Sequence, residues 1–349
     1  MDYNEIYNRL PRALLPWYRS SHRDLPWRLS KDPYHIWVSE IMLQQTRVEA
    51  VKGYYSRFLE KLPTIEDLAN ADDELLHKLW EGLGYYNRAN NLKKAAEVIM
   101  EKLGGQFPQN YEEVLSLPGI GAYTAGAICS IAFDSPTPAV DGNVLRVISR
   151  LTNDDTCVDD ESYKNAVRAK LARIYPDAAG DFTQALMELG ATVCGPNRKP
   201  ECEACPCKDF CLGLRAGAAQ QLPVRKQKKA RREEEKTVFI LSCNGEYAIE
   251  KRDKKGLLAG LWQFPNTAGK MELNGALDTL REWGFTARDI YQTIERKHIF
   301  THIQWNMTGI YVEVNQKTER FTWMTAAQIE AEAALPTAFR QFWEIRPTI

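Results

Sequence analysis

The stretch LPGIGAYTAG, residues 117–126, decides the fold, because three glycines crowd ten positions next to an apolar, helix-like segment. It lacks the Gly-Lys-Ser/Thr ending of a nucleotide-binding loop, and no strand precedes it. A glycine turn that opens a helix points backbone N–H groups outward, and the helix dipole attracts an anion there. With helices on both sides of Gly119 and Gly121, this anion could be a nucleic-acid backbone phosphate, contacted without regard to sequence. A helix end followed by a helix start, with nothing bound, fits the same residues.

The rest of the chain divides into two halves of different pattern. Up to residue 215, apolar spacings of three and four residues predict helices. The clearest helical patterns cover residues 65–84, 91–104, 162–176 and 181–194. Farther on, residues 237–252 form two strand-like runs joined by Asn244-Gly245, a strong hairpin signal. Residues 298–314 are also rich in β-forming side chains, and residues 325–335 predict a short helix. We predict a multidomain protein with an all-α region over 1–215, a linker over 216–235, and an α+β domain over 236–349.

Composition limits the classes of protein to consider. The chain has 349 residues, of which 44% are hydrophobic and 26% charged, and its net charge is −1. Residues 222–236 hold seven basic and three acidic side chains, so attraction to a polyanion is local. No apolar run approaches the roughly 18 residues of a membrane span, and the N-terminus has no apolar signal-peptide centre. We expect a cytoplasmic protein that does not bind membranes, with its cysteines as metal ligands or thiols.

Four of the eight cysteines lie close together in CGPNRKPECEACPCKDFC, residues 194–211. Cys194, Cys202, Cys205 and Cys211 are separated by seven, two and five residues. Four thiolates in one loop can close on a metal centre, and the compact loop without histidine favours a [4Fe–4S] cluster over zinc. Buried free thiols are the alternative, and Cys207 adds a fifth thiol to the choice of ligands.

The combination of motifs resembles a known superfamily. LPGIGAYTAG, an aspartate (Asp141) about twenty residues later and the four-cysteine loop resemble the helix–hairpin–helix base-excision glycosylases, the superfamily of endonuclease III, over residues 20–215. DLPWR (24–28), WVSEIMLQQT (37–46), EGLGYYNRA (81–89) and VDGNV (140–144) are similar to the adenine DNA glycosylases of the MutY type. The resemblance implies a six-helix barrel module with the hairpin at about 26–133, and an iron–sulfur module from 1–25 and 134–215. The first cysteine interval is one residue longer than is usual in that family.

Two carboxylates are suited to cleave an N-glycosidic bond. Such a reaction needs an acid for the leaving group and a carboxylate beside an oxocarbenium-like sugar. Glu40 lies in an apolar stretch that raises the pKa of a carboxyl, and the resemblance gives it the protonation of adenine N7. Asp141 is placed to cap a helix that begins near Val144, which should keep it ionised beside the anomeric carbon. It acts there as stabiliser or as nucleophile, with Asn143 as its orienting partner. An exposed helical glutamate and a plain helix cap are the alternatives.

Tyr123 separates two kinds of glycosylase. In bifunctional relatives the corresponding residue is a lysine, whose amine forms a Schiff base with the sugar and allows strand cleavage. A phenol cannot form an imine. Tyr123 therefore predicts a monofunctional enzyme that removes the base and leaves the strand intact.

Reaching a base inside the duplex requires its extrusion, and the gap must be filled. By the resemblance, Gln45 wedges into the stack, Thr46 contacts the bases, and Tyr85 intercalates beside 8-oxoguanine with Leu83 near it. The same resemblance lines the adenine pocket, together with Glu40, by Trp27, Arg28, Val48 and Gln184. A carboxamide such as that of Gln184 offers both a donor and an acceptor to an adenine edge. Trp27 and Tyr85 also fit as core aromatics, and Arg150 is expected to reach toward the cysteine loop.

The C-terminal half resembles a Nudix-like domain. Its nearest match to the catalytic Nudix box, REWGF at 281–285, lacks the paired glutamates, which argues against pyrophosphate hydrolysis. The family reads 8-oxoguanine with a Phe-Ser-His turn, and the counterpart here is Phe300, Thr301 and His302. Threonine keeps the hydroxyl and the backbone N–H. An ordinary β-turn is the alternative.

The sequence thus predicts a monomeric DNA repair enzyme that removes adenine opposite 8-oxoguanine or guanine in double-stranded DNA, in the cytoplasm of a bacterium at the nucleoid. Two other functions stay open. A thymine-mismatch or pyrimidine-lesion glycosylase would usually lack the C-terminal domain. A non-catalytic iron–sulfur protein that binds damaged DNA would have no use for Glu40 and Asp141.

Overall fold

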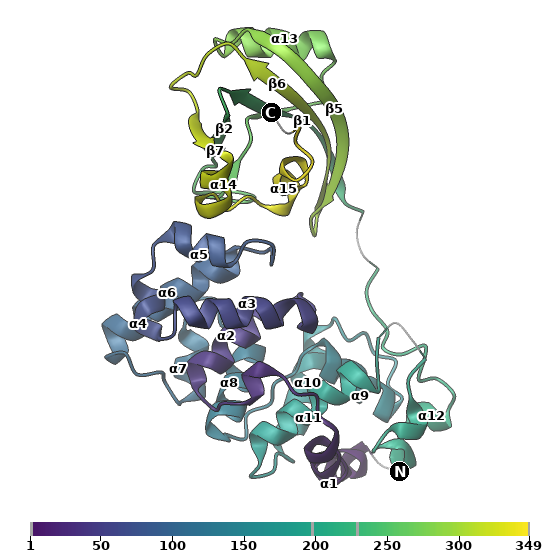
Figure 1. Cartoon of the computed structure of the whole chain (residues 1–349). Coiled ribbons are helices and arrows are strands. Elements are labelled where there is room, and N and C mark those ends of the chain that lie inside the picture. The colour runs from purple at the N-terminus through teal and green to yellow at the C-terminus, as the bar shows by residue number, and fades with distance from the viewer. Residues whose placement is uncertain (1–2, 197–198, 228–229, 348–349) are drawn as a thin grey trace. The chain divides into compact units, whose positions relative to one another are not determined.

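The computed structural model describes residues 3–196, 199–227 and 230–347 (Figure 1). The described residues form two compact units, one from within 1–70 and 90–227 and the other from within 71–89 and 228–349. The first unit is helical and the second contains the sheet, as the sequence predicts. Within the described residues, no helix combines the length and the apolar character that crossing a membrane requires.

The first unit is built from helices and short 3₁₀ turns. They are α1 (Tyr3–Ser21), η1 (Pro26–Arg28), α2 (Pro33–Leu43), α3 (Val48–Lys61), α4 (Ile65–Asn70), α6 (Asn87–Leu103, whose first three residues fall in the second unit), α7 (Tyr111–Ser116), α8 (Ala122–Phe133), α9 (Gly142–Thr152), α10 (Glu161–Ala172), α11 (Ala179–Thr192), η2 (Cys202–Ala204), η3 (Lys208–Phe210) and α12 (Leu212–Arg215). The predicted helix over 65–84 is wrong as one element. The chain leaves the helix after Asn70, and the side chain of Asp72 caps a new one by accepting from Leu75 N.

Helix α8 is the centre of the first unit. It packs against α2, α7 and α11 (Figure 1), and its residues Thr124–Ile131 are all buried. The small residues of AYTAGAICSIAF allow this close packing. A Cβ on Gly126 would lie 2.3 Å from Pro138 O, so only glycine lets the 135–140 backbone run against α8. That backbone leads directly into Asp141, so the packing of α8 fixes where Asp141 starts α9.

Helices α1, α9, α10 and α11 share a hydrophobic core in the same unit. Leu14, Val147 and Phe182 are fully buried in it, and Cys207, Phe210 and Cys211 of the cysteine loop pack on it. The loop is therefore attached to the same helices that carry Asp141 and Gln184.

The second unit is a sheet of the order β3-β2-β1-β6-β5, with β4 paired to β1 and β7 paired to β2. Its elements are α5 (Asp73–Leu79), β1 (Arg232–Cys243), β2 (Glu246–Lys251), β3 (Trp262–Gln263), β4 (Asn266–Ala268), α13 (Leu273–Glu282), β5 (Ala287–Ile299), β6 (Ile303–Val314), β7 (Thr322–Thr325), α14 (Ala326–Glu332) and α15 (Thr337–Trp343). Strands β1 and β6 are parallel neighbours, and β5 and β6 form a long hairpin.

Helices cover both faces of this sheet. One core contains Phe339 and Phe342 of α15 with Trp305 of β6, and the other contains Leu280 of α13 with Phe239 of β1. This explains the continuous buried run Thr237–Cys243, since a strand covered on both faces has no polar side. The Asn244-Gly245 hairpin and the helix α14 are confirmed, whereas α13 and α15 were not predicted.

The units differ from the predicted ranges at three places. Residues 216–227, which the sequence assigned to the linker, belong to the first unit. Strand β1 begins at Arg232, inside the predicted linker, because Arg232 pairs with Ile303 of β6. Residues 71–89 belong with the sheet, although they come from the helical part of the sequence. Glu74 accepts from Trp262 Nε1 at 2.9 Å, and Glu81 accepts from Leu335 N at 3.1 Å.

Candidate active site

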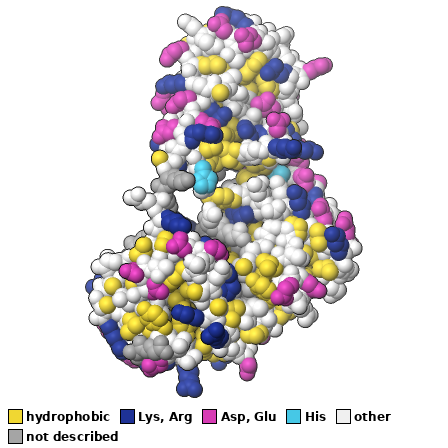
Figure 2. Space-filling model, turned by 180° about the vertical axis from the view of Figure 1, so that it is seen from behind, with side chains coloured by type: hydrophobic (Ala, Val, Ile, Leu, Met, Phe, Trp, Pro, Cys, Tyr) yellow, Lys and Arg dark blue, Asp and Glu magenta, His cyan; other side chains and the backbone are white. Residues whose placement is uncertain are grey.

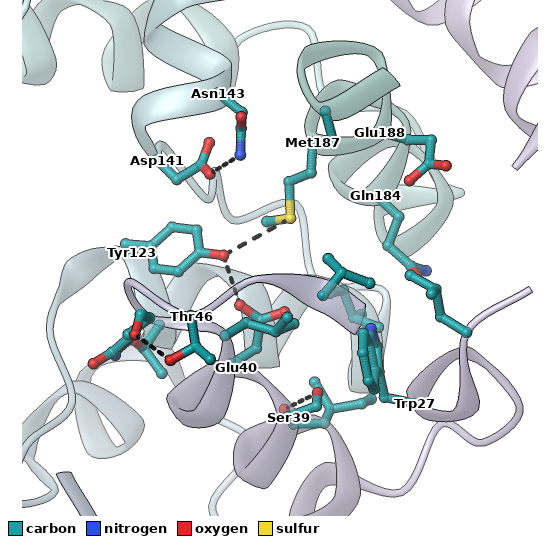
Figure 3. Close-up of a pocket in the computed structure, with 18 of the residues that line it drawn as sticks. Trp27, Ser39, Glu40, Thr46, Tyr123, Asp141, Asn143, Gln184, Met187 and Glu188 are labelled. Atoms are coloured by element: carbon teal, nitrogen blue, oxygen red, sulfur yellow. Dashed lines mark hydrogen bonds between the residues drawn. The ribbon is translucent and has the colours of Figure 1, made fainter. Parts of the chain in front are cut away.

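The first unit contains one large cavity, of about 600 Å³, in which most of the predicted residues meet (Figure 3). The predicted residues that line it are Trp27, Arg28, Glu40, Gln45, Thr46, Val48, Gly121, Tyr123, Asp141, Asn143 and Gln184. They come from η1, α2, the α2–α3 turn, α3, and the starts of α8, α9 and α11. Gly119 does not line the cavity, and the cysteines lie elsewhere.

Glu40 is a buried carboxyl with one close partner. Its residue is 5% exposed, and Tyr123 Oη donates to Glu40 Oε2 at 2.6 Å (Figure 3). Burial raises the pKa of Glu40 to about 7, the charge of Asp141 adds to this, and the Tyr123 hydrogen bond and Arg28 oppose it. A large fraction of Glu40 therefore carries a proton near neutral pH, which suits a general acid. The alternative of an exposed helical glutamate is wrong.

Asp141 caps α9, as its sequence position predicts. Its Oδ1 accepts from Val144 N at 2.8 Å, and its Oδ2 accepts from Asn143 Nδ2 at 2.7 Å. Burial nevertheless raises the pKa of Asp141, and the hydrogen bonds from Val144 and Asn143 and the charge of Arg146 pull it down. The position of Asp141 at the start of α9 therefore does not alone determine its ionisation. The N-terminal end of α9 lies in the wall of the cavity, and burial there opposes the charged form.

Asn143 links Asp141 to the cysteine loop. Arg146 Nη2 donates to Asn143 Oδ1 at 2.8 Å, and Arg146 Nε donates to Cys194 O at 2.9 Å. Arg150, one turn later, donates to Cys194 O at 3.0 Å and lies 3.3 Å from Cys194 Sγ, which confirms the predicted reach toward the loop. The orientation of Asp141 thus depends on contacts that continue to Cys194.

Tyr123 remains a neutral phenol in this site. Burial and the carboxylates of Glu40 and Asp141 raise the pKa of Tyr123 well above its ordinary value. Its oxygen also lies 3.8 Å from Met187 Sδ (Figure 3). The side chain can orient Glu40 but offers no amine, so the cavity has no nucleophile for a Schiff base at this position.

The wall of the cavity includes residues that the sequence did not point to. Arg23, Met187 and Glu188 line the cavity, and Glu188 is completely buried. Glu188 follows Gln184 by four residues, so both lie on one face of α11, and this spacing could have shown the site (Figure 3). Gln184 Nε2 donates to Gly180 O in a long hydrogen bond of 3.4 Å.

Gln45 and Gly119 have a left-handed backbone, whereas Gly121 is extended. Gln45, in the turn between α2 and α3, has φ 58°, a conformation that is uncommon for a residue other than glycine. Gly119 has φ 76°, and a Cβ there would lie 2.5 Å from Asn91 Cβ. Gly121 is exposed and starts α8 without a side-chain cap, so the first N–H groups of α8 are available for an anion.

The four predicted cysteine ligands surround a second, apolar cavity. Its walls also include Val147, Leu189 and Arg150. Within the described ranges, no three His, Cys, Asp or Glu side chains are close enough to bind one metal ion together. Four thiols around one apolar cavity are a donor set that could hold an iron–sulfur cluster. Residues 197 and 198, in the long first interval, lie outside the described residues.

The second unit brings its own predicted residues together. Tyr85 has φ 50°, is half exposed, and its hydroxyl lies 3.0 Å from Thr301 Oγ1. Thr301 is at the tip of the β5–β6 hairpin, where Phe300 N donates to Ile303 O and the Phe300 ring packs edge-on against Trp305. His302 O accepts from Arg232 N, and Leu83 is buried. Tyr85 is thus a surface aromatic that meets the predicted turn.

The surface carries charges of both signs, as the net charge of −1 predicts. Figure 2 shows Lys and Arg side chains interspersed with Asp and Glu on the face in view, without a continuous patch of either sign.

Comparison with known proteins supports both units. Residues 38–175 match the family model described as HhH-GPD superfamily base excision DNA repair protein, and residues 237–345 match a NUDIX domain. The chain is 34% identical to an adenine DNA glycosylase of Rattus norvegicus, over 96% of this chain and 77% of that protein. Both units therefore have counterparts within one relative.

Two solved structures resemble the helical unit. A thermostable thymine-DNA glycosylase is 32% identical, with a TM-score of 0.55, over 61% of this chain and 98% of its own. An endonuclease III–DNA covalent intermediate is 25% identical, with a TM-score of 0.52, over 62% of this chain and 99% of its own. These likenesses confirm the helix–hairpin–helix fold of the first unit.

Proposed function

The chain belongs to the family of adenine DNA glycosylases, within the HhH-GPD superfamily of base excision repair proteins, and we propose that it acts on adenine opposite 8-oxoguanine. It is a DNA glycosylase that removes adenine. The observation that supports the chemistry best is the buried pair of Glu40 and Tyr123, 2.6 Å apart, in a cavity that also contains Asp141. Two carboxyls in different environments can serve as acid and as ionic stabiliser.

Glu40 would act as the general acid. With its pKa raised to about 7, it holds a proton that can pass to N7 of the departing adenine. Tyr123 occupies one carboxyl oxygen, which leaves the other to face the base. The proton gained by N7 makes the base a better leaving group, and the electrons of the glycosidic bond depart with it.

Asp141 would support the sugar that remains. Its carboxylate is oriented by Val144 N and Asn143 Nδ2 and lines the same cavity as Glu40. A negative charge there stabilises an oxocarbenium-like sugar, whether through space or through a transient bond. Because Tyr123 cannot form an imine, we propose base removal without strand cleavage.

The base opposite the adenine would be read by the second unit. The hydroxyls of Tyr85 and Thr301 lie 3.0 Å apart, and the Tyr85 ring is half exposed. The ring can stack on a base, and the Thr301 hydroxyl can then contact the polar edge of that base. The NUDIX match of the second unit, together with the similarity of the whole chain to adenine DNA glycosylases, favours adenine over thymine as the excised base.

A [4Fe–4S] cluster is the cofactor that we propose for the cysteine loop. Cys194, Cys202, Cys205 and Cys211 would hold it, since they line one apolar cavity beside Arg150. When bound, such a cluster cross-links the loop and so supports its contact with α9.

One assay tests the function. Single-turnover reactions with duplexes that hold A opposite 8-oxoguanine, A opposite G, and T opposite G are quenched in alkali to reveal abasic sites. We expect cleavage of the A strands, fastest opposite 8-oxoguanine, and none without alkali. Cleavage of only the T strand would support a thymine glycosylase, and binding without any cleavage would support a non-catalytic protein.

A further inference from the structure

Glu188 forms a buried ionic cluster with two arginines in the wall of the active-site cavity. Its side chain is 0% exposed, whereas those of Arg23 and Arg28 are 37% and 10% exposed. Both carboxylate oxygens are used. Arg23 Nε donates to Oε1 at 2.8 Å, and Arg23 Nη2 and Arg28 Nη2 donate to Oε2 at 2.9 and 2.8 Å. A buried carboxylate held in this way is fixed in place and fully ionised.

The cluster also fixes the turn that carries Trp27. Arg23 N donates to Glu188 Oε1 at 3.1 Å, and Arg28 Nη1 donates to Arg23 O at 2.9 Å. The two arginines therefore bracket the segment 23–28, and α11 holds it through a single carboxylate. The Arg28 guanidinium also lies 5.5 Å from the centroid of the Tyr18 ring.

Arg28 lines the same cavity as Glu40, and its positive charge favours the ionised form of that carboxyl. An uncompensated arginine would remove the proton that the acid must hold. Glu188 supplies the compensating negative charge, since it binds the same guanidinium. The titratable and charged groups that line the described cavity around Glu40 are Tyr123 from α8, Asp141 from the start of α9, Arg28 from η1, and Arg23 and Glu188.

We propose that Glu188 is a positioning residue for base excision: it fixes Arg28 in the wall of the cavity that contains Glu40 and offsets part of the positive charge there. This inference rests on the proposed role of Glu40 as the acid. The cluster carries two positive charges and one negative charge, so its net charge can be changed in either direction by substitution.

The pH–rate profile of single-turnover adenine excision tests the proposal. Glu188→Gln leaves both arginines uncompensated, so the high-pH limb should move down by about one pH unit, and the rate above the limb should fall about tenfold. Arg23→Gln removes one positive charge, and the limb should move up. The double variant restores the net charge of the cluster, and its limb should return toward that of the wild type.

Asp181→Asn is the matched control. Asp181 lies on the same helix and pairs with Arg19, but its side chain is 38% exposed and it does not line the active-site cavity. This variant should keep the wild-type profile. Thermal melting reports whether each variant folds, and if Glu188→Gln does not, the upward shift in Arg23→Gln still tests the charge effect.

A limb that stays in place in Glu188→Gln and Arg23→Gln, with only the rate lowered, would overturn the proposal and leave Glu188 a structural residue. A wild-type protein that excises no adenine would instead remove the proposed function. The two failures are therefore distinguishable.

Discussion

The hydrogen bond from Tyr123 to Glu40 makes a prediction whose size can be worked out. Tyr123→Phe keeps the ring in α8 and removes only the donor to Glu40 Oε2, at 2.6 Å. A hydrogen bond to a charged group contributes about 1.5–3 kcal/mol, and about 1.4 kcal/mol corresponds to one pKa unit. This bond favours the ionised carboxyl, so without it the pKa of Glu40 should rise from about 7 by roughly one unit or more.

The sign of the effect on rate follows from the role of Glu40. The reaction needs the protonated acid, so the rate falls as the pH rises through the pKa of Glu40. In Tyr123→Phe the high-pH limb should move upward, and near pH 8 the variant should retain more of its maximal rate than the wild type. Its maximal rate should be lower, because a carboxyl without its orienting bond is less well placed.

Single-turnover excision across the pH range measures both quantities. Tyr175→Phe is the matched control, because its hydroxyl is also hydrogen-bonded, 2.8 Å from Thr183 Oγ1, but the residue does not line the cavity. This control should keep the position of the limb. A limb in Tyr123→Phe that moves downward, or stays at the wild-type pH, would refute the argument that this bond tunes the acid.

Three further changes test other parts of the site. Asp141→Asn should abolish excision while DNA binding persists, measured by gel shift beside the excision assay, because asparagine keeps the helix cap and removes the charge. Gly119→Ala should weaken DNA binding and lower the melting temperature, since its φ of 76° is strained for alanine and the new Cβ meets Asn91. Thr301→Val should reduce the preference for 8-oxoguanine over guanine, read as a ratio of excision rates, because it removes the hydroxyl partner of Tyr85.

Local sequence patterns predicted many of the helices, strands and caps. They did not predict contacts between residues that are far apart in the sequence. The Asn244-Gly245 hairpin and the Asp141 cap depend on neighbours in sequence, and both are confirmed. Glu188 was missed because its partner Arg23 is 165 residues away, and the only local signal was its spacing of four residues from Gln184. The link between Tyr123 and Glu40 spans 83 residues in the same way.

The grouping of residues 71–89 with the sheet could not be read from periodicity either. The helical pattern there correctly predicts a helix, α5. It does not show against which hydrophobic core that helix packs. Glu74 and Glu81 decide it by binding Trp262 Nε1 and Leu335 N in the second unit. Only a knowledge of those partners, far along the chain, would have shown this.

The different tasks of the two carboxyls follow from what surrounds each of them. Burial raises the pKa of both. Asp141 receives two hydrogen bonds and faces Arg146, which all favour its ionised form. Glu40 receives one, from Tyr123, and the nearby cation is shared with Glu188. The same burial therefore leaves one carboxyl able to give a proton and the other better able to hold a negative charge, and substitutions at Tyr123 or Glu188 should move the acid limb in opposite directions.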